Sequence, residues 1–213
     1  MRRLVLAAAA AAAFVYPAFA QTPAAPAQVN LGPNTWSVDT NHTAAGFSVK
    51  HMMVTTVRGT LGPVKGTVEY DGKSVESIKA DITIDVNGVN TNNEGRDKDL
   101  KSPNFFDVAQ FPTATFKSKR AVADGAGKFK LIGDLTIHGV TKEVTLNVEG
   151  PSPVLKQPNG ALKMGASATT TINRKEFGMQ WNRMVEAAPV VSDDVQITID
   201  LELNKRPPTA APF

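Results

Sequence analysis

The sequence contains no cysteine, only three histidines among its 213 residues, and no long apolar run beyond its N-terminal twenty residues. Without cysteine the chain cannot form disulfides, Cys-ligated zinc sites, iron–sulfur clusters or a thiolate nucleophile. Its basic residues are not clustered with aromatics, which argues against nucleic-acid binding. A glycine-rich phosphate loop and a βαβ nucleotide-binding unit are also missing. We therefore expect a binding protein rather than an enzyme, with no cofactor and no metal.

The N-terminus has the layout of a secretory signal peptide over residues 1–20. Two arginines precede an apolar run over residues 4–16, which is too short to span a membrane, and a small-residue cleavage site follows. Cleavage after Ala20 removes two of the 23 basic residues and none of the 20 acidic ones, which leaves a net charge of +1. We expect a periplasmic protein, and full secretion stays open as the alternative.

The rest of the chain divides into one domain and two tails. Residues 21–34 are rich in proline and alanine and are expected to form a flexible leader, and residues 206–213 a disordered tail. Between them, residues 35–205 show no linker and no repeat, and their length is sufficient for one core.

Strict alternation of apolar and polar residues is the strongest signal in the domain. The final segment alternates Val195, Ile197, Ile199, Leu201 and Leu203 with Gln196, Thr198, Asp200 and Glu202. Such a period of two predicts a β-strand with one buried face. Similar patterns predict further strands over residues 36–38, 45–53, 64–70, 78–86, 114–116, 129–137, 144–148 and 164–172. A meander of eight or nine strands either closes into a barrel or splits into two packed sheets, and periodicity leaves both open.

One segment interrupts the strands. The run Thr91-Asn92-Asn93-Glu94 is typical of a capping box and predicts a short helix that ends near Lys101, before Pro103. Three phenylalanines follow closely, at positions 105, 106 and 111. The helix and these aromatics either close one mouth of a barrel or simply cap its core.

Candidate catalytic groups are few. Ser167 lies in a strand pattern and lacks the closing glycine of a nucleophile turn. His42, His51 and His138 could share a metal, but the nine-residue spacing of the first two places them on opposite faces of a continuous strand. A calcium loop at residues 90–101 fails, because Lys101 stands where a bidentate Glu is needed. These patterns favour structural histidines and no metal site.

Ordered motifs along the domain resemble the YceI-like family. They are Trp36-Ser37-Val38-Asp39, His42-Thr43, Phe47–His51, Val57-Arg58-Gly59, Arg96-Asp97 with Leu100, Phe105-Phe106-Asp107, Phe111-Pro112, Thr115-Phe116, Gly133–Thr141, Asn173-Arg174 and Phe177-Gly178-Met179. The chain departs from the family pattern at Thr43, Asp99 and Ala187-Ala188-Pro189. The resemblance implies an all-β fold, an extended eight-stranded antiparallel lipocalin-like barrel with a short helix near one opening. It also implies a periplasmic protein that carries or stores a long polyisoprenoid, including quinone-type lipids, and it supplies no catalytic set.

Together, the pattern and the resemblance predict a ligand site inside the barrel. The expected lining residues are Phe47, Val49, Ile82, Ile84, Phe105, Phe106, Phe116, Met164, Phe177, Met179 and Trp181. A head group is expected at the mouth near His42, Arg96 or Arg174. The alternatives are an enzyme of the same fold that acts on a lipid or quinone through a histidine or metal, and a lipocalin that sequesters amphiphilic toxins. Transient membrane contact and a homodimer are further expectations.

Overall fold

The computed structural model describes residues 32–186 and 188–205. The predicted signal peptide, the leader up to residue 31 and the C-terminal tail lie outside these residues. The described elements are β1 (Thr35–Val38), β2 (Ala44–His51), β3 (Thr55–Thr60), β4 (Val64–Glu69), η1 (Val75–Ser77), β5 (Lys79–Asp85), η2 (Val86–Gly88), α1 (Glu94–Lys101), β6 (Thr113–Ala123), β7 (Lys128–Ile137), β8 (Val140–Glu149), β9 (Leu155–Lys156), β10 (Leu162–Asn173), η3 (Arg174–Phe177), β11 (Met184–Val185), β12 (Ala188–Pro189) and β13 (Val191–Lys205). The η elements are 3₁₀ turns.

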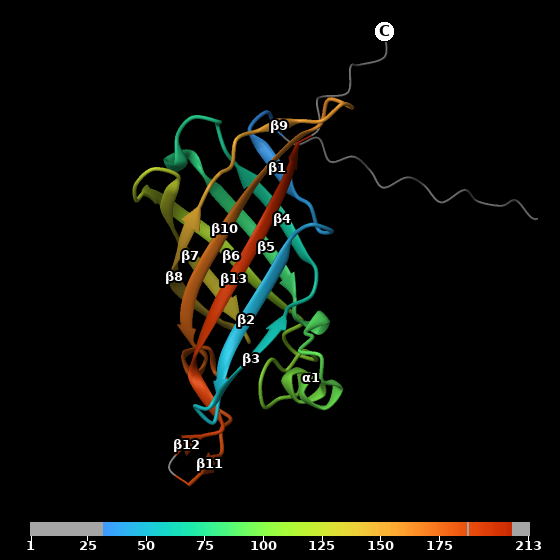
Figure 1. Ribbon diagram of the computed structural model, residues 1–213, viewed down its shortest axis with the longest axis vertical. Coiled ribbons are helices and arrows are strands. Elements are labelled where there is room, and N and C mark those ends of the chain that lie inside the picture. The colour runs from blue at the N-terminus through green and yellow to red at the C-terminus, as the bar shows by residue number, and fades with distance from the viewer. Residues whose placement is uncertain (1–31, 187, 206–213) are drawn as a thin grey trace, which may run out of the picture. The chain divides into compact units, whose positions relative to one another are not determined.

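The main sheet closes on itself through β13. One edge of β13 pairs with β10 from Leu162↔Lys205 to Asn173↔Asp194, and its other edge pairs first with β2 and then with β1. From β1 the antiparallel order continues through β4, β5, β6, β7, β8 and back to β10 (Figure 1). With β1–β2 and β3–β4 each counted as one interrupted strand, the described residues form a closed eight-stranded antiparallel barrel. The barrel prediction is confirmed.

Alternation explains which side chains face the interior. On β5, Ala80, Ile82 and Ile84 are buried, whereas Lys79 and Asp81 are exposed. The same period buries Phe129, Leu131 and Leu135 on β7. Because each strand has one apolar face, closing the sheet gathers these faces into one core and leaves the charged faces in water.

The structure corrects three details of the predicted elements. Strand β3 was missed, because Thr55–Thr60 carries one large apolar residue, Val57, and shows no alternation. Met53 was expected on a strand but lies in the β2–β3 turn with a φ of 59°. The predicted helix is present and ends at Lys101, but it begins at Glu94, two residues later than a capping box at Thr91 implies. Its N-cap is Asn93, whose side chain accepts a hydrogen bond from the amide of Arg96 at 2.9 Å. Thr91 instead bonds to Asp97.

The two ends of the barrel differ. At one end, which we call the α1 end, lie the β2–β3 turn, helix α1, η3 and the β11–β12 hairpin; β9 lies at the other end (Figure 1). Strand β3 does not continue the sheet to β5 here, and an isolated bridge between Thr60 and Asn90 joins it to the segment that carries α1. Among the described helices, none has the length and apolar character needed to cross a membrane. Helix α1 and the β11–β12 hairpin therefore lie at one end of the barrel, and η1 and the segment that carries β9 lie at the other.

Candidate functional site

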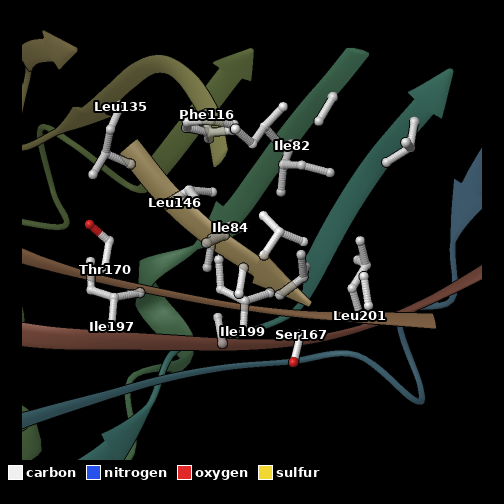
Figure 2. Close-up of a pocket in the computed structure, with 18 of the residues that line it drawn as sticks. Ile82, Ile84, Phe116, Leu135, Leu146, Ser167, Thr170, Ile197, Ile199 and Leu201 are labelled. Carbon is white, nitrogen blue, oxygen red and sulfur yellow. The ribbon is translucent and has the colours of Figure 1, made fainter. Parts of the chain in front are cut away.

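A large apolar cavity occupies the interior of the barrel. It measures about 1190 Å³, including the space at its openings, and within the described part of the chain no polar atom is exposed on its wall. Residues from eight strands line this space: β2, β4, β5, β6, β7, β8, β10 and β13. Among them are Ile82 and Ile84 from β5, Phe116 from β6 and Ile199 from β13 (Figure 2). Figure 2 shows the hydroxyl oxygen of Ser167 turned away from them. We call this space the inner chamber.

A second chamber of about 610 Å³ adjoins the inner chamber toward the α1 end. The two share Leu61, Ile137 and Ile197 as wall residues. Phenylalanines 105 and 106, which follow α1, form part of its outer wall. The segment after α1 therefore both covers the core and lines the cavity.

A third space of about 1010 Å³, which we call the mouth, lies between β2, β3, α1 and Trp181. It shares Phe47, Val49, Leu100, Phe105 and Val191 with the second chamber. The three spaces thus form one series along β13, which they follow from Leu203 to Val191. Twelve residue steps in a strand correspond to about 40 Å.

The mouth is the polar part of this series. Lys50, His51, Arg96 and Asp99 lie on its wall beside apolar residues. Of these, the guanidinium of Arg96 is held in place, because it donates from Nε to Thr91 Oγ1 at 2.8 Å and from one terminal nitrogen to the Thr91 carbonyl at 2.9 Å. A fixed cation at an apolar opening can receive the polar end of an amphiphile.

Close approach of backbone and ring shapes the wall near the mouth. Gly59 on β3 lies against the ring of Phe47, and a Cβ at this position would stand 2.6 Å from the ring and 2.7 Å from the Thr91 methyl. Only glycine leaves the space that Phe47 occupies. On the opposite wall, the rings of Phe105 and Trp181 pack with centroids 5.3 Å apart. Tight local packing therefore sets the position of three aromatic side chains around the opening.

Arg174 lies beside the second chamber, but its donors are engaged by the protein. It is 3% exposed and donates to the carbonyls of Met179 (2.6 Å), Trp181 (2.7 Å) and Ser192 (3.1 Å) and to the carboxylate of Asp193 (3.0 Å). Burial lowers the pKa of Arg174 and Asp193 opposes this shift, yet a guanidinium stays charged in proteins. Arg174 therefore anchors the loop after η3 to β13.

His42 lies away from the chambers, near the other end of the barrel. Its Nδ1 is 3.1 Å from Asp39 and 3.7 Å from Glu202, and Lys163 pairs with the same two carboxylates. Hydrogen bonds, from Asn204 first and then from His42, lower the pKa of Asp39 far below its usual value. The ammonium group of Lys163 offsets the charge of one of the two carboxylates in this cluster.

Most of the predicted lining residues lie on the three spaces. The inner chamber contacts Ile82, Ile84, Phe116 and Met164; the second chamber contacts Phe106, Met179 and Arg174; the mouth contacts Arg96 and Trp181; and Phe47, Val49 and Phe105 contact both of the latter spaces. Phe177 and His42 contact none of the three. Phe177 is 1% exposed and belongs to the solid core.

Several wall residues escaped the sequence prediction of the site. Leu61 stands between β3 and β4 and forms a boundary between two chambers, but it belongs to no periodic segment. Ile197 and Ile199 carried a clear signal, because they alternate on the strand with the strongest pattern. The inward face of β13 would have identified them.

The three histidines lie too far apart to share a metal ion. His51 pairs with Val191 at one end of β13, whereas His42 contacts Glu202 near its other end. Eleven residue steps in a strand separate these two points by about 36 Å. His138 lies in the β7–β8 turn against Phe111, with ring centroids 4.8 Å apart. The spacing in the sequence did not decide this point, because a break at residues 39–43 separates β1 from β2.

Residues 36–203 match the family model of the YceI-like domain. Among curated sequences, the chain is similar to a UPF0312 protein of Staphylococcus aureus, with 35% identity over 171 residues that cover 79% of this chain and 96% of that protein. The similarity therefore extends over the whole barrel.

Solved structures with the same fold include three of interest. The Campylobacter jejuni YCEI protein is 31% identical, with a TM-score of 0.64 over 74% of this chain and 90% of that one. Burkholderia cenocepacia BcnA is 23% identical, with a TM-score of 0.67 over 78% of this chain and 98% of that one. A polyisoprenoid binding domain from Saccharophagus degradans is 18% identical, with a TM-score of 0.58 over 81% of this chain and 98% of that one. At such low identity the last two support the fold alone.

Proposed function

Because the chain belongs to the YceI-like family, we propose that it binds a long-chain isoprenoid lipid, polyprenyl or quinone-type, inside its barrel. We further propose that it carries or stores this lipid in the periplasm. The observation that carries the proposal is the series of adjoining spaces, mainly apolar, from Leu203 to the mouth. The name of the Saccharophagus degradans domain, with the same fold, points to the same ligand class.

The wall of the inner chamber selects for apolar guests. A polar group placed there would lose its hydrogen bonds to water and, among the described residues, find no exposed polar atom to replace them. The shape of the path, about 40 Å along β13, suits an extended chain better than a compact molecule. Met164 and Met179 add flexible thioether side chains, which adapt to chains of different length.

We assign the head group of the lipid to the mouth, beside Arg96. This guanidinium is held by Thr91, and Arg96 lines the mouth together with Lys50 and His51. A quinone carbonyl or a phosphate would accept a hydrogen bond there. Arg174 and His42 are poorer candidates, since the first spends four hydrogen bonds on the protein and the second lies near the opposite end.

Energetics favour a carrier over a permanent store. Transfer of a forty-carbon tail from water to an apolar site has a gross free energy of about 30 kcal/mol, at about 0.8 kcal/mol per carbon. This exceeds the practical ceiling of about 20 kcal/mol for non-covalent binding. The competing solvent for the tail is a bilayer, in which it is equally dry. The net preference for the protein over the membrane is therefore small, and a small preference permits both loading and unloading.

We propose that the protein binds its guest without transforming it. The separation of His42 from His51, about 36 Å along β13, supports this, because these two histidines cannot act together on one reacting group. Metal analysis of the purified protein tests the rival, an enzyme with a histidine-held metal. Stoichiometric metal that is lost on substitution of one of these histidines would favour the enzyme.

Detergent-free purification from the periplasm tests the proposal directly. Native mass spectrometry should show a lipid adduct, and solvent extraction should identify an isoprenoid chain. The intact mass should also correspond to cleavage after Ala20. A protein that always emerges empty, and that fails to take up a polyprenyl alcohol delivered from cyclodextrin, would refute the proposal.

A further inference from the structure

Four large apolar side chains are exposed around the mouth. Met53 and Val54 in the β2–β3 turn are 58% and 85% exposed, and Met184 and Val185 on β11 are 59% and 39% exposed. They make up four of the seven large apolar residues that are exposed within the described chain. We call these four residues the apolar rim. Isolated apolar residues on a surface are ordinary, but a group of them at the opening of an apolar path calls for an explanation.

Hydrogen bonds join the two segments of the rim to each other. The amide of Met52 donates to the Val190 carbonyl at 3.0 Å, and the amide of Val190 donates to the Arg183 carbonyl at 2.8 Å. The side chain of Asn182 bonds to both the carbonyl and the amide of Val191, at 2.7 and 3.2 Å. The base of the hairpin is therefore tied to the end of β2. Figure 1 shows the hairpin extending past the barrel on the α1 side.

The rim adjoins the mouth directly. His51, Thr55 and Val190 line the mouth, and each lies within two residues of the β2–β3 turn or of β12. A guest that leaves the mouth on this side meets the rim before it meets bulk water. The apolar path through the barrel thus continues onto an exposed apolar surface.

The charges beside the rim are mainly positive. Within residues 50–58 and 183–189, Lys50, Arg58 and Arg183 are cationic and Glu186 is the single acidic residue, which gives a net charge of +2 with His51 neutral. Helix α1 on the other side of the mouth carries three acidic and three basic residues and adds no net charge. An apolar tip flanked by cations suits the headgroup region of an anionic bilayer.

We propose that the apolar rim is a membrane-docking surface that inserts into the interface of an anionic bilayer and places the mouth against the lipid. This rests on the proposed function, since it explains how an isoprenoid chain passes between bilayer and barrel without crossing water. The rim consists of two narrow protruding segments rather than a flat face. Such segments enter the boundary between headgroups and acyl chains more readily than they cover a second protein.

The test uses the delipidated mature protein and two matched variants. The rim variant combines Met53→Ser, Val54→Ser, Met184→Ser and Val185→Ser. The control variant combines Val154→Ser and Leu155→Ser, which are also exposed (48% and 61%) but lie beside β9 at the other end. All substituted side chains are on the surface, so thermal unfolding should be nearly the same for the three proteins.

Flotation with vesicles of phosphatidylcholine plus phosphatidylglycerol measures docking. The rim variant should associate at least about tenfold more weakly than the parent protein, because its apolar contact with the bilayer is lost. Association of the parent should weaken at high salt or without phosphatidylglycerol. Transfer of a fluorescent polyprenyl lipid from these vesicles should slow to a similar degree in the rim variant, and the control variant should behave as the parent.

Uptake of the same lipid from cyclodextrin separates the two proposals. If the rim variant still fills from cyclodextrin but transfers slowly from vesicles, the docking proposal holds. Equal vesicle association of parent and rim variant would overturn it, even if the barrel binds lipid. A larger loss of vesicle association in the control variant than in the rim variant would overturn it as well. So would a parent protein that is dimeric and a rim variant that is monomeric, if both bind vesicles equally. Failure of all three proteins to take up lipid from cyclodextrin would instead refute the proposed function.

Discussion

Filling the inner chamber is the sharpest test of the cavity. Ala168 on β10 lines this chamber and pairs with Ile199 of β13. In a close-packed interior, Ala168→Phe would cost about 1–3 kcal/mol, because added atoms force their neighbours to move. In an open chamber the new ring instead buries apolar surface, a term of about 1.5–3 kcal/mol for a whole phenylalanine side chain. The sign of the change in the free energy of unfolding therefore reports whether the space exists.

The same substitution should obstruct the guest. A ring that displaces one five-carbon isoprene unit removes about 4 kcal/mol of gross transfer free energy, at about 0.8 kcal/mol per carbon. One decade of affinity corresponds to about 1.4 kcal/mol, so this is an upper bound near a thousandfold, and we expect a loss of at least about a hundredfold. Thr169→Phe is the matched control, because Thr169 is exposed and faces outward opposite Thr198.

Urea unfolding of the empty protein measures the free energy of unfolding, and titration with a polyprenyl lipid delivered from cyclodextrin measures the lipid affinity. Ala168→Phe should keep or raise the free energy of unfolding and lose lipid affinity. Thr169→Phe should leave the affinity unchanged. Destabilisation of Ala168→Phe by about 2 kcal/mol with lipid uptake intact would mean that the interior is packed and that the guest binds elsewhere.

Two further predictions concern the polar groups that hold the barrel ends. Arg174→Met should lower the free energy of unfolding in urea by about 2–4 kcal/mol, because it leaves buried carbonyls and Asp193 without their partner. Lys175→Met loses only an exposed ion pair with Asp193 and should change the free energy of unfolding by less than about 1 kcal/mol. Equal effects of the two substitutions would contradict the role of Arg174. The hydrogen bond from Asn204 lowers the pKa of Asp39, so the stability that this carboxylate contributes is complete above about pH 4 and is lost as the pH falls further. Asp39→Asn should therefore lower the free energy of unfolding by about 1–3 kcal/mol at pH 7. It should also reduce the fall of the melting temperature below about pH 4, and an unchanged fall would rule this role out.

Strand periodicity predicted the barrel wall well where it was regular. Residues 195–203 and 78–86 alternate without fault, and both lie on strands whose apolar face points inward. Alternation did not predict β3, because threonines and Gly59 leave Val57 as the only large apolar residue of this strand. This strand is held in place by pairing with β2, from Gly46↔Thr60 to His51↔Thr55, and such pairing leaves no trace in its own residues.

Alternation indicated which apolar side chains lie on the wall of the inner chamber, but it gave no such guide for polar groups. Ile82, Ile84 and Phe116 were placed on the inner chamber because their face was clear from alternation. Arg174, His42 and Arg96 were grouped as head-group contacts, although they lie in three different settings. Their roles depend on partners distant in sequence, such as Glu202 beside His42, which no local pattern reveals.

The sequence by itself determined that the domain is a sheet protein with one apolar face per strand and little equipment for catalysis. These properties are local, since a period of two and the absence of cysteine are read residue by residue. Only the tertiary structure decided that the sheet closes, because closure depends on β10 and β1 meeting opposite edges of β13. It also decided that the interior keeps open space and that its mouth lies beside Arg96. Both follow from how far apart the closed walls stand, which is a property of the whole ring of strands and of no single segment.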